Sequence, residues 1–153
     1  MSVKLEDLKP EVMYKAQRGI QSLIDGGIPF SVRRTLSTTD EQYAYWLQGR
    51  ATLGMVNAAR VFAYMRPLLP AENKYTVTRC DGKTIKSKHQ GGRAIDIVPK
   101  DENGNPTWDY AKYAKQYRRI VDMMKDAGFS CGADWPPINP VTELGWDPPH
   151  HQA

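Results

Sequence analysis

The stretch Ser87-Lys-His-Gln-Gly-Gly-Arg-Ala-Ile-Asp-Ile-Val98 decides the fold, because a polar loop passes directly into an apolar segment. Residues 93–98 are predicted to form a strand. Successive side chains of a strand point to opposite faces, so Asp96 shares a face with Ala94 and Val98. An ionised carboxylate inside an apolar strand is costly to bury unless it is paired or binds a metal.

The Gly91-Gly92 pair lies between His89 and Asp96. Glycine tolerates tight bends, so this pair can fold the imidazole back toward the carboxylate. One interpretation is that His89 and Asp96 form one half of a metal site. The other is that His89 is a solvated loop residue and that Asp96 pairs with Arg93 or Lys100.

The second half of such a site is predicted in Asp147-Pro-Pro-His150. Two prolines favour polyproline II, whose three-residue turn places Asp147 and His150 on the same side. Catalytic zinc needs three protein ligands, an open position and a nearby carboxylate that accepts a proton. His89, Asp96, His150 and Asp147 fill these roles. The alternative is an exposed, Pro-rich tail whose histidines have no function or bind metal adventitiously.

In the rest of the chain, the spacing of hydrophobic residues predicts the helices and strands. Helices are predicted over residues 10–25, 39–47, 53–65 and 108–127, the second of them opened by a capping box at Thr38–Glu41. Strands are predicted over residues 28–33, 75–79, 93–98 and 129–131, and residues 135–151 as an ordered loop plus a terminal edge strand. Helices first, then strands broken by one long helix, predict an α+β fold with a small, mainly antiparallel sheet packed against helices.

The composition is that of an ordinary globular protein. The chain has 153 residues, of which 41% are hydrophobic and 25% charged. A chain of this length buries a core without disulfide staples, which excludes collagen-like, disordered and mini-scaffold classes. Cys80 and Cys131 are too few for a disulfide framework and too far apart for the usual paired zinc ligands, so packing is their expected use. We therefore expect one domain over residues 1–153.

The charge and hydropathy of the chain limit the kinds of partner that we expect it to bind. The formal net charge is +4, and residues 73–93 carry six Lys/Arg against one Asp. This basic segment could steer an anionic partner or be a solvated loop, and since no base-reading motif is present we expect no nucleic-acid partner. Arg60 and Arg66 interrupt the most apolar run, residues 53–69, so no membrane span is expected. The charged N-terminus lacks the apolar region of a signal peptide.

Taken together, three motifs resemble a known family. Ser87-x-His89-x-x-Gly92-x-Ala94-x-Asp96, Gly132-Ala-Asp-Trp135 and Asp147-x-x-His150 are similar to the zinc peptidoglycan peptidases of the D-Ala-D-Ala carboxypeptidase (VanY/VanX-like) superfamily. The resemblance is strongest to phage endolysins that are L-alanyl-D-glutamate endopeptidases. Glu41-Gln42 and Gln48-Gly49-Arg50 also look like the N-terminal helix of the family. The resemblance implies the zinc D,D-peptidase/Hedgehog-like fold.

The resemblance also implies roles for individual residues. His89, Asp96 and His150 would bind one Zn²⁺, Asp147 would be the general base, and Ser87 would lie beside the site. The more distant carboxypeptidases and dipeptidases of the superfamily usually have Glu where this chain has Asp147. This difference favours the endopeptidase branch.

The family's substrate-binding arginine has no direct counterpart. Its usual position falls at Ser37, so either Arg34 takes the role through a local insertion or another cation such as Arg79 does. Asp134 either orients a ligand histidine or caps a turn. Trp135 is either a wall of the cleft or a core aromatic.

The function implied by the resemblance is hydrolysis of the L-Ala–D-Glu bond in peptidoglycan stem peptides. We expect a phage endolysin for host lysis, monomeric and without a separate cell-wall-binding domain. It would accumulate in the host cytoplasm without a signal peptide and reach the wall after another protein permeabilises the membrane. A bacterial wall-recycling enzyme fits the same features. The alternatives are a D,D-carboxypeptidase or dipeptidase with the same site, and a non-catalytic peptidoglycan-binding module.

Overall fold

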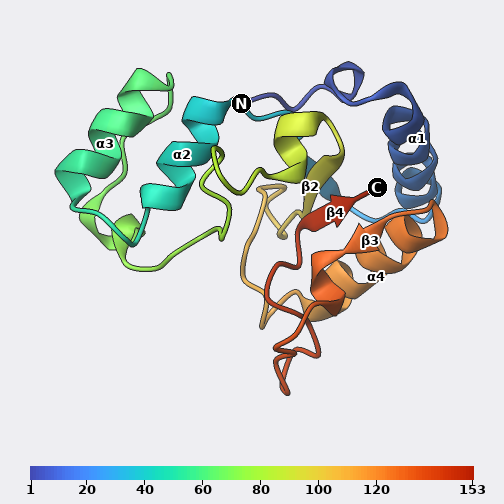
Figure 1. Cartoon of the computed structure of the whole chain (residues 1–153). Coiled ribbons are helices and arrows are strands. Elements are labelled where there is room, and N and C mark those ends of the chain that lie inside the picture. Colours follow the sequence, from blue (N-terminus) through green and yellow to red (C-terminus); the bar gives the residue numbers. More distant parts are fainter.

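A four-stranded antiparallel sheet lies at the centre of the structure, a computed structural model that describes residues 1–153 (Figure 1). Its strands are β1 (Phe30–Arg34), β2 (Ala94–Pro99), β3 (Ser130–Cys131) and β4 (His150–Gln152). Their order across the sheet is β1-β2-β4-β3. The predicted α+β class with a small antiparallel sheet is confirmed.

Four α-helices flank the sheet in two pairs. These are α1 (Pro10–Asp25), α2 (Thr39–Leu47), α3 (Leu53–Phe62) and α4 (Ala114–Asp126). In Figure 1, α2 and α3 lie to the left of the sheet, and α1 and α4 to its right. The Thr38 hydroxyl caps α2 by accepting the Glu41 N–H at 3.2 Å, which is one half of the predicted capping box. The other half is not formed, because the Glu41 carboxylate contacts the Thr38 hydroxyl and the N-terminal amine instead.

The two helix pairs belong to two hydrophobic clusters. The larger contains 18 buried residues from α1, α4, the sheet and nearby loops, among them Leu23, Ile97 and Tyr117. The smaller consists of Leu47, Val56 and Leu68 between α2 and α3. A cavity between the two helix pairs is lined by residues from the sheet and from α2 and α3.

Two strand predictions are wrong. Residues 75–79 form a loop, because they pair with none of the four strands and β propensity without a partner strand stabilises little. The terminal strand exists as β4 but is not an edge. It lies between β2 and β3, so its backbone is paired on both sides.

Two helices are shorter than predicted. The helix expected over 108–127 begins only at Ala114, because the Asp109 carboxylate accepts the Lys112 N–H at 3.0 Å and holds a turn there. The helix expected over 53–65 ends at Phe62, and Tyr64 follows with a positive φ of 59°.

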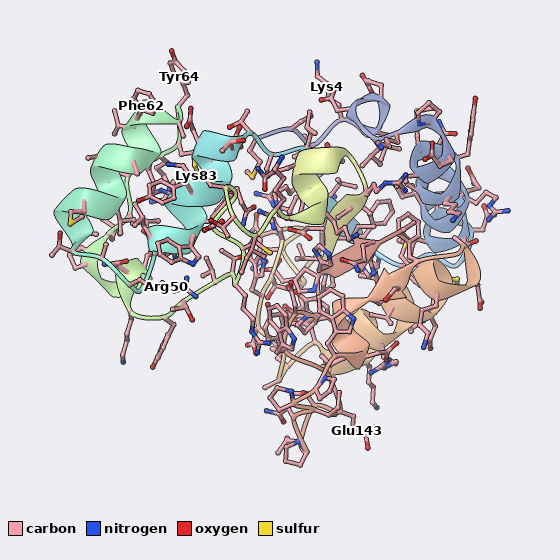
Figure 2. All side chains as sticks on the ribbon, in the orientation of Figure 1. Lys4, Arg50, Phe62, Tyr64, Lys83 and Glu143 are labelled. Atoms are coloured by element: carbon pink, nitrogen blue, oxygen red, sulfur yellow. The ribbon has the colours of Figure 1, made fainter.

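Helix α3 exposes apolar side chains and buries a charged one. Phe62 and Tyr64 are 73% and 100% exposed and project from its outer end in Figure 2, whereas Arg60 is only 8% exposed. Despite this apolar surface, none of the helices is both long enough and apolar enough to cross a membrane.

Candidate metal centre

Three side chains converge on one point next to the sheet. His89 Nε2 lies 3.0 Å from Asp96 Oδ1 and 3.2 Å from His150 Nδ1, and these last two atoms are 3.3 Å apart. Asp96 and His150 are cross-strand partners of β2 and β4. The structure thus brings together the three residues expected as metal ligands.

His89 is presented by a short 3-10 helix, η3 (Lys88–Gly91). The Ser87 hydroxyl caps this helix by accepting the His89 N–H at 3.2 Å. The helix ends at Gly92, whose φ is +65° and where a Cβ would lie 3.2 Å from the Asp7 carbonyl oxygen. The Gly-Gly pair therefore makes the expected bend, since a side chain at position 92 would strain it.

Each histidine uses its remote nitrogen to donate a hydrogen bond. His89 Nδ1 lies 3.1 Å from the Thr35 carbonyl oxygen, which can only accept. His150 Nε2 lies 3.0 Å from Gln152 Oε1. In the neutral form of each ring, these bonds place the proton on the far nitrogen and leave the inner nitrogen as a lone-pair acceptor.

Asp96 is held by a cation on its outer side. Arg34 Nε donates to Asp96 Oδ2 at 2.9 Å, which leaves Oδ1 facing the two imidazoles. Burial by itself would raise the pKa of Asp96, but the charge of Arg34, together with His89 and His150, holds that pKa well below its usual value. The carboxylate is therefore ionised.

This arrangement fits a zinc ion. Two imidazole lone pairs and a carboxylate oxygen face one another within about 3.3 Å, a set of acceptors that is stabilised by a cation at its centre. Ligands about 2.0–2.1 Å from a tetrahedral zinc stand about 3.3 Å apart. Two nitrogens and one oxygen are also a donor set that zinc accepts, with a fourth position left open.

The two histidines differ in their tendency to bind a proton. Burial lowers the pKa of His89, which has no exposed surface. Burial acts to lower the pKa of His150 as well, but the hydrogen bond to Asp96 and the negative charges of Asp96 and Asp147 together outweigh it, so the pKa is raised. At neutral pH His89 is therefore neutral, the form that can bind a metal.

Asp147 lines the same cavity as Asp96. Burial raises the pKa of Asp147 to about 6, and the negative charge of Asp96 contributes to the rise. The carboxylate is thus mostly ionised at pH 7 but close enough to neutrality to accept and return a proton.

Glycine permits the backbone of Asp147 to reach this position. A Cβ on Gly132 would lie 2.1 Å from the Asp147 carbonyl oxygen and 2.9 Å from its Cβ. No side chain fits at that distance. Gly132 belongs to the predicted Gly132–Trp135 motif, whose role is therefore to allow close packing against the chain that carries Asp147.

The cavity has a volume of about 700 Å³ and lies between the sheet and the α2–α3 pair. Its charged lining residues are Arg33, Arg34, Arg60, Glu72, Asp96 and Asp147. Tyr45, Trp108 and Tyr110 add aromatic surface. A cleft of this size with ionised groups on its wall suits a polar ligand such as a peptide.

The remaining predicted residues divide into two groups. Ser87, Arg34 and Trp135 lie at the cluster: Ser87 caps the helix of His89, Arg34 pairs with Asp96, and the Trp135 ring centroid is 5.3 Å from that of His150. Asp134 and Arg79 do not touch it.

The structure contradicts the metal-site option for Asp134. Its carboxylate pairs with Arg118 at 3.1 Å and Lys125 at 2.8 Å, both on α4, and contacts no histidine. The local motif places Asp134 close to the site in sequence, but the side chain points to the basic face of the helix. Arg79 is exposed, with its guanidinium 4.8 Å from the centre of the Trp146 ring, and does not line the cavity.

Sequence reasoning missed the partners that orient the ligands. The Thr35 carbonyl oxygen is a backbone atom and leaves no mark in a sequence. Gln152 was available as a signal, because residues two apart in a strand share a face and Gln152 follows His150 at that spacing. Arg60 was noted only as an interruption of an apolar run, although its place on the inner face of α3 puts it in the cavity.

Parts of the chain are similar in sequence to known proteins. Residues 81–153 match the model of a family described as D-alanyl-D-alanine carboxypeptidase. This segment carries η3, β2 and β4, and so contains the three clustered residues and Asp147. A curated relative, Aspartic proteinase A3 of Arabidopsis thaliana, is 25% identical over 133 residues, and the match covers 83% of this chain. The chain spans about a quarter of the length of that relative, 24%.

Solved structures share the fold over nearly the whole chain. The Serratia marcescens L-Ala D-Glu endopeptidase ChiX has a TM-score of 0.57 at 17% identity, covering 97% of this chain and 81% of that one. A VanY D,D-pentapeptidase in complex with Zn(II) has a TM-score of 0.54 at 18% identity, covering 95% and 71%. The LdcB LD-carboxypeptidase has a TM-score of 0.57 at 15% identity, covering 99% and 62%. These similarities confirm the fold that the sequence predicted, that of the zinc D,D-peptidases.

Proposed function

We propose that this protein is a zinc metallopeptidase that hydrolyses the L-Ala–D-Glu bond of peptidoglycan stem peptides. The observation that carries the proposal is the buried cluster of His89, Asp96 and His150, with three mutually facing acceptor atoms 3.0–3.3 Å apart. The cluster lies beside Asp147 at the wall of a peptide-sized cavity. This combination is what a metallopeptidase requires.

The comparisons support the substrate class. The matched family and the three solved structures are all named for enzymes of peptide or peptidoglycan cleavage, and ChiX is named for this bond. The choice of the endopeptidase branch rests on Asp147, where the carboxypeptidases of the resembled superfamily usually have Glu.

Each residue has a distinct role in the proposed reaction. His89, Asp96 and His150 would hold the zinc ion, which would supply Lewis acidity for the hydrolysis. Arg34 keeps the Asp96 carboxylate ionised and oriented. Asp147 removes a proton from the water that attacks the L-Ala carbonyl carbon. The same carboxyl group then donates that proton to the departing amine of D-Glu.

The biological setting belongs to the proposal as well. We propose a monomeric phage endolysin in which residues 1–153 form one catalytic domain. It would act on host peptidoglycan after another protein permeabilises the membrane. The basis for this setting is the resemblance of Ser87–Asp96 and Asp147–His150 to endolysins of this type.

A D,D-carboxypeptidase is the second candidate. It is favoured by the description of the family whose model matches residues 81–153. The two candidates share the metal ligands and differ in the bond cleaved. A carboxypeptidase would release terminal D-Ala, whereas the endopeptidase would expose the amine of D-Glu.

Mass spectrometry of stem peptides separates the candidates. Purified peptidoglycan is incubated with the protein, with the protein plus a zinc chelator, and with the chelated protein after zinc is restored. Products beginning with D-Glu that disappear with chelator and return with zinc are expected. Released D-Ala would assign the carboxypeptidase activity instead.

An Asp147→Asn variant is the matched control. It keeps the shape of the side chain but removes the base, so hydrolysis is expected to fall about 10²-fold or more with unchanged zinc content. Equal effects of both proteins on cell walls, with no cleavage by either, would indicate a peptidoglycan-binding module and refute the proposed enzyme.

A further inference from the structure

Arg60 is a buried cation without an anionic partner. Its side chain, on α3, is 8% exposed, and its only hydrogen bond is from Nε to the Arg66 carbonyl oxygen at 2.6 Å. No carboxylate lies within ion-pair distance of it, and its two terminal nitrogens donate to no protein atom. A charge removed from water in this way is costly unless something else compensates it.

The other buried cation of the cavity is compensated. Arg34 donates to Asp96 at 2.9 Å, so its charge is used by a proposed metal ligand. Glu72, the remaining acid near Arg60, is engaged by Arg66, whose two terminal nitrogens lie 2.8 and 3.2 Å from its oxygens. Arg60 is therefore the buried guanidinium that is left free to bind an anion from outside.

Arg60 lines the same cavity as Asp96 and Asp147. Its guanidinium carbon lies 5.8 Å from the centre of the Tyr45 ring, and that of Arg34 lies 5.0 Å from the same point. The two guanidinium groups are thus at most about 11 Å apart. An anion on Arg60 would lie within a few residues of a peptide bond held at the metal centre.

We propose that Arg60 binds a carboxylate of the stem peptide and thereby determines which peptides the enzyme cleaves. This inference rests on the proposed function and adds the substrate group that the site recognises. A guanidinium presents two parallel N–H donors that match a carboxylate. An ammonium group keeps the charge but not this geometry, and an amide lacks the charge. Two carboxylates lie within two residues of the bond that would be cleaved, the free one of D-Glu and that of diaminopimelate at the third position.

The test compares four synthetic stem peptides. They combine D-Glu or its carboxamide at the second position with diaminopimelate or lysine at the third. The value of kcat/KM is measured for the zinc-loaded wild type and for the Arg60→Gln, Arg60→Lys and Arg33→Gln variants. Arg33 lines the same cavity, so its variant controls for the general loss of positive charge.

We expect the wild type to prefer one carboxylate over its neutral counterpart by about 10-fold or more. Arg60→Gln should abolish that preference through a higher KM, Arg60→Lys should restore part of it, and Arg33→Gln should keep it. The position at which the preference is lost identifies the carboxylate. A preference that survives in Arg60→Gln, or that falls equally in Arg33→Gln, overturns the proposal.

Binding to the Asp147→Asn background separates this inference from the proposed function. Dissociation constants of the four peptides are measured with and without the additional Arg60→Gln change. Discrimination that depends on Arg60 but is accompanied by no hydrolysis in the wild type would retain the carboxylate site and refute the peptidase. Hydrolysis without such discrimination would retain the peptidase and refute the carboxylate site at Arg60. If Arg60→Gln lowers the melting temperature, Arg60→Lys supplies the comparison.

Discussion

The pKa of Asp147 differs from its ordinary value in a way that matters for the proposed reaction. Burial, together with the negative charge of Asp96, raises its pKa to about 6. Only the ionised carboxylate can accept a proton, and ionisation increases as the pH rises through the pKa. Activity is therefore lost on the acid side.

We expect kcat/KM of the wild type to rise with pH by about tenfold per unit below pH 6 and to level off near pH 7. Zinc content is measured over the same range, since protonation of the ligand histidines also releases metal in acid. A profile that stays flat between pH 5 and 7 at constant zinc content would contradict the role of Asp147.

Arg34 was predicted as a substrate-binding candidate, and in the structure it lines the cavity and forms an ion pair with Asp96. Removing the guanidinium leaves Asp96 Oδ2 without its donor and allows its pKa to rise. We expect Arg34→Gln to weaken zinc affinity by about 10–100-fold, as changes behind metal ligands do. Competition with a chromogenic chelator measures this.

The neighbouring Arg33→Gln provides the comparison, because Arg33 contacts no ligand of the cluster and lies over the Trp108 ring. Its zinc affinity should stay close to that of the wild type. Equal losses in both variants would indicate a general electrostatic effect rather than the Arg34–Asp96 pair.

Elements fix the site through close contacts of their backbones. The 3-10 turn after β3 approaches the segment that carries Asp147, and Gly132 leaves no space for a Cβ there. We expect Gly132→Ala to displace Asp147, lowering kcat/KM by at least about 10-fold and the free energy of unfolding by about 1–3 kcal/mol. Hydrolysis assays and thermal denaturation measure the two effects.

Gly54→Ala is the matched control, because a Cβ at this position in α3 would meet nothing within 4 Å. Alanine favours a helix over glycine, so this variant should retain activity and gain up to about 1 kcal/mol of stability. A Gly132→Ala variant that behaves like Gly54→Ala would show that the turn can move without affecting the site.

At the scale of the whole molecule, the metal centre connects separate parts of the chain. His89 lies in η3, just before β2, while Asp96 and His150 are 54 residues apart in sequence but belong to adjacent strands of the sheet. Zinc that binds only the folded protein stabilises it in proportion to its affinity. Its removal also leaves three acceptors facing one another.

We expect chelation to lower the melting temperature by about 5–10 °C, since 1 kcal/mol shifts a domain of this size by about 2–4 °C. Calorimetry with chelator, and again after zinc is restored, checks this. A His150→Ala variant should melt low and not respond to chelator. An unchanged melting temperature in the wild type would mean that the cluster does not bind zinc in the folded protein.

The sequence by itself determined the features that depend on neighbouring residues. Alternation in residues 93–98 placed Asp96 among buried side chains, the Gly-Gly pair predicted the bend that returns His89 to it, and Asp147-Pro-Pro-His150 predicted a shared side. These follow from backbone geometry over a few residues, which a local pattern specifies.

Only the tertiary structure decided what meets what across the fold. It placed β4 inside the sheet rather than at its edge, left residues 75–79 without a partner strand, and gave Arg34 to Asp96. It also paired Asp134 with Arg118 on α4 and placed Arg60 in the wall of the cavity. The physical reason is that strand pairing, ion pairs and burial depend on groups far apart in the chain, whose competition is settled only when the whole core packs.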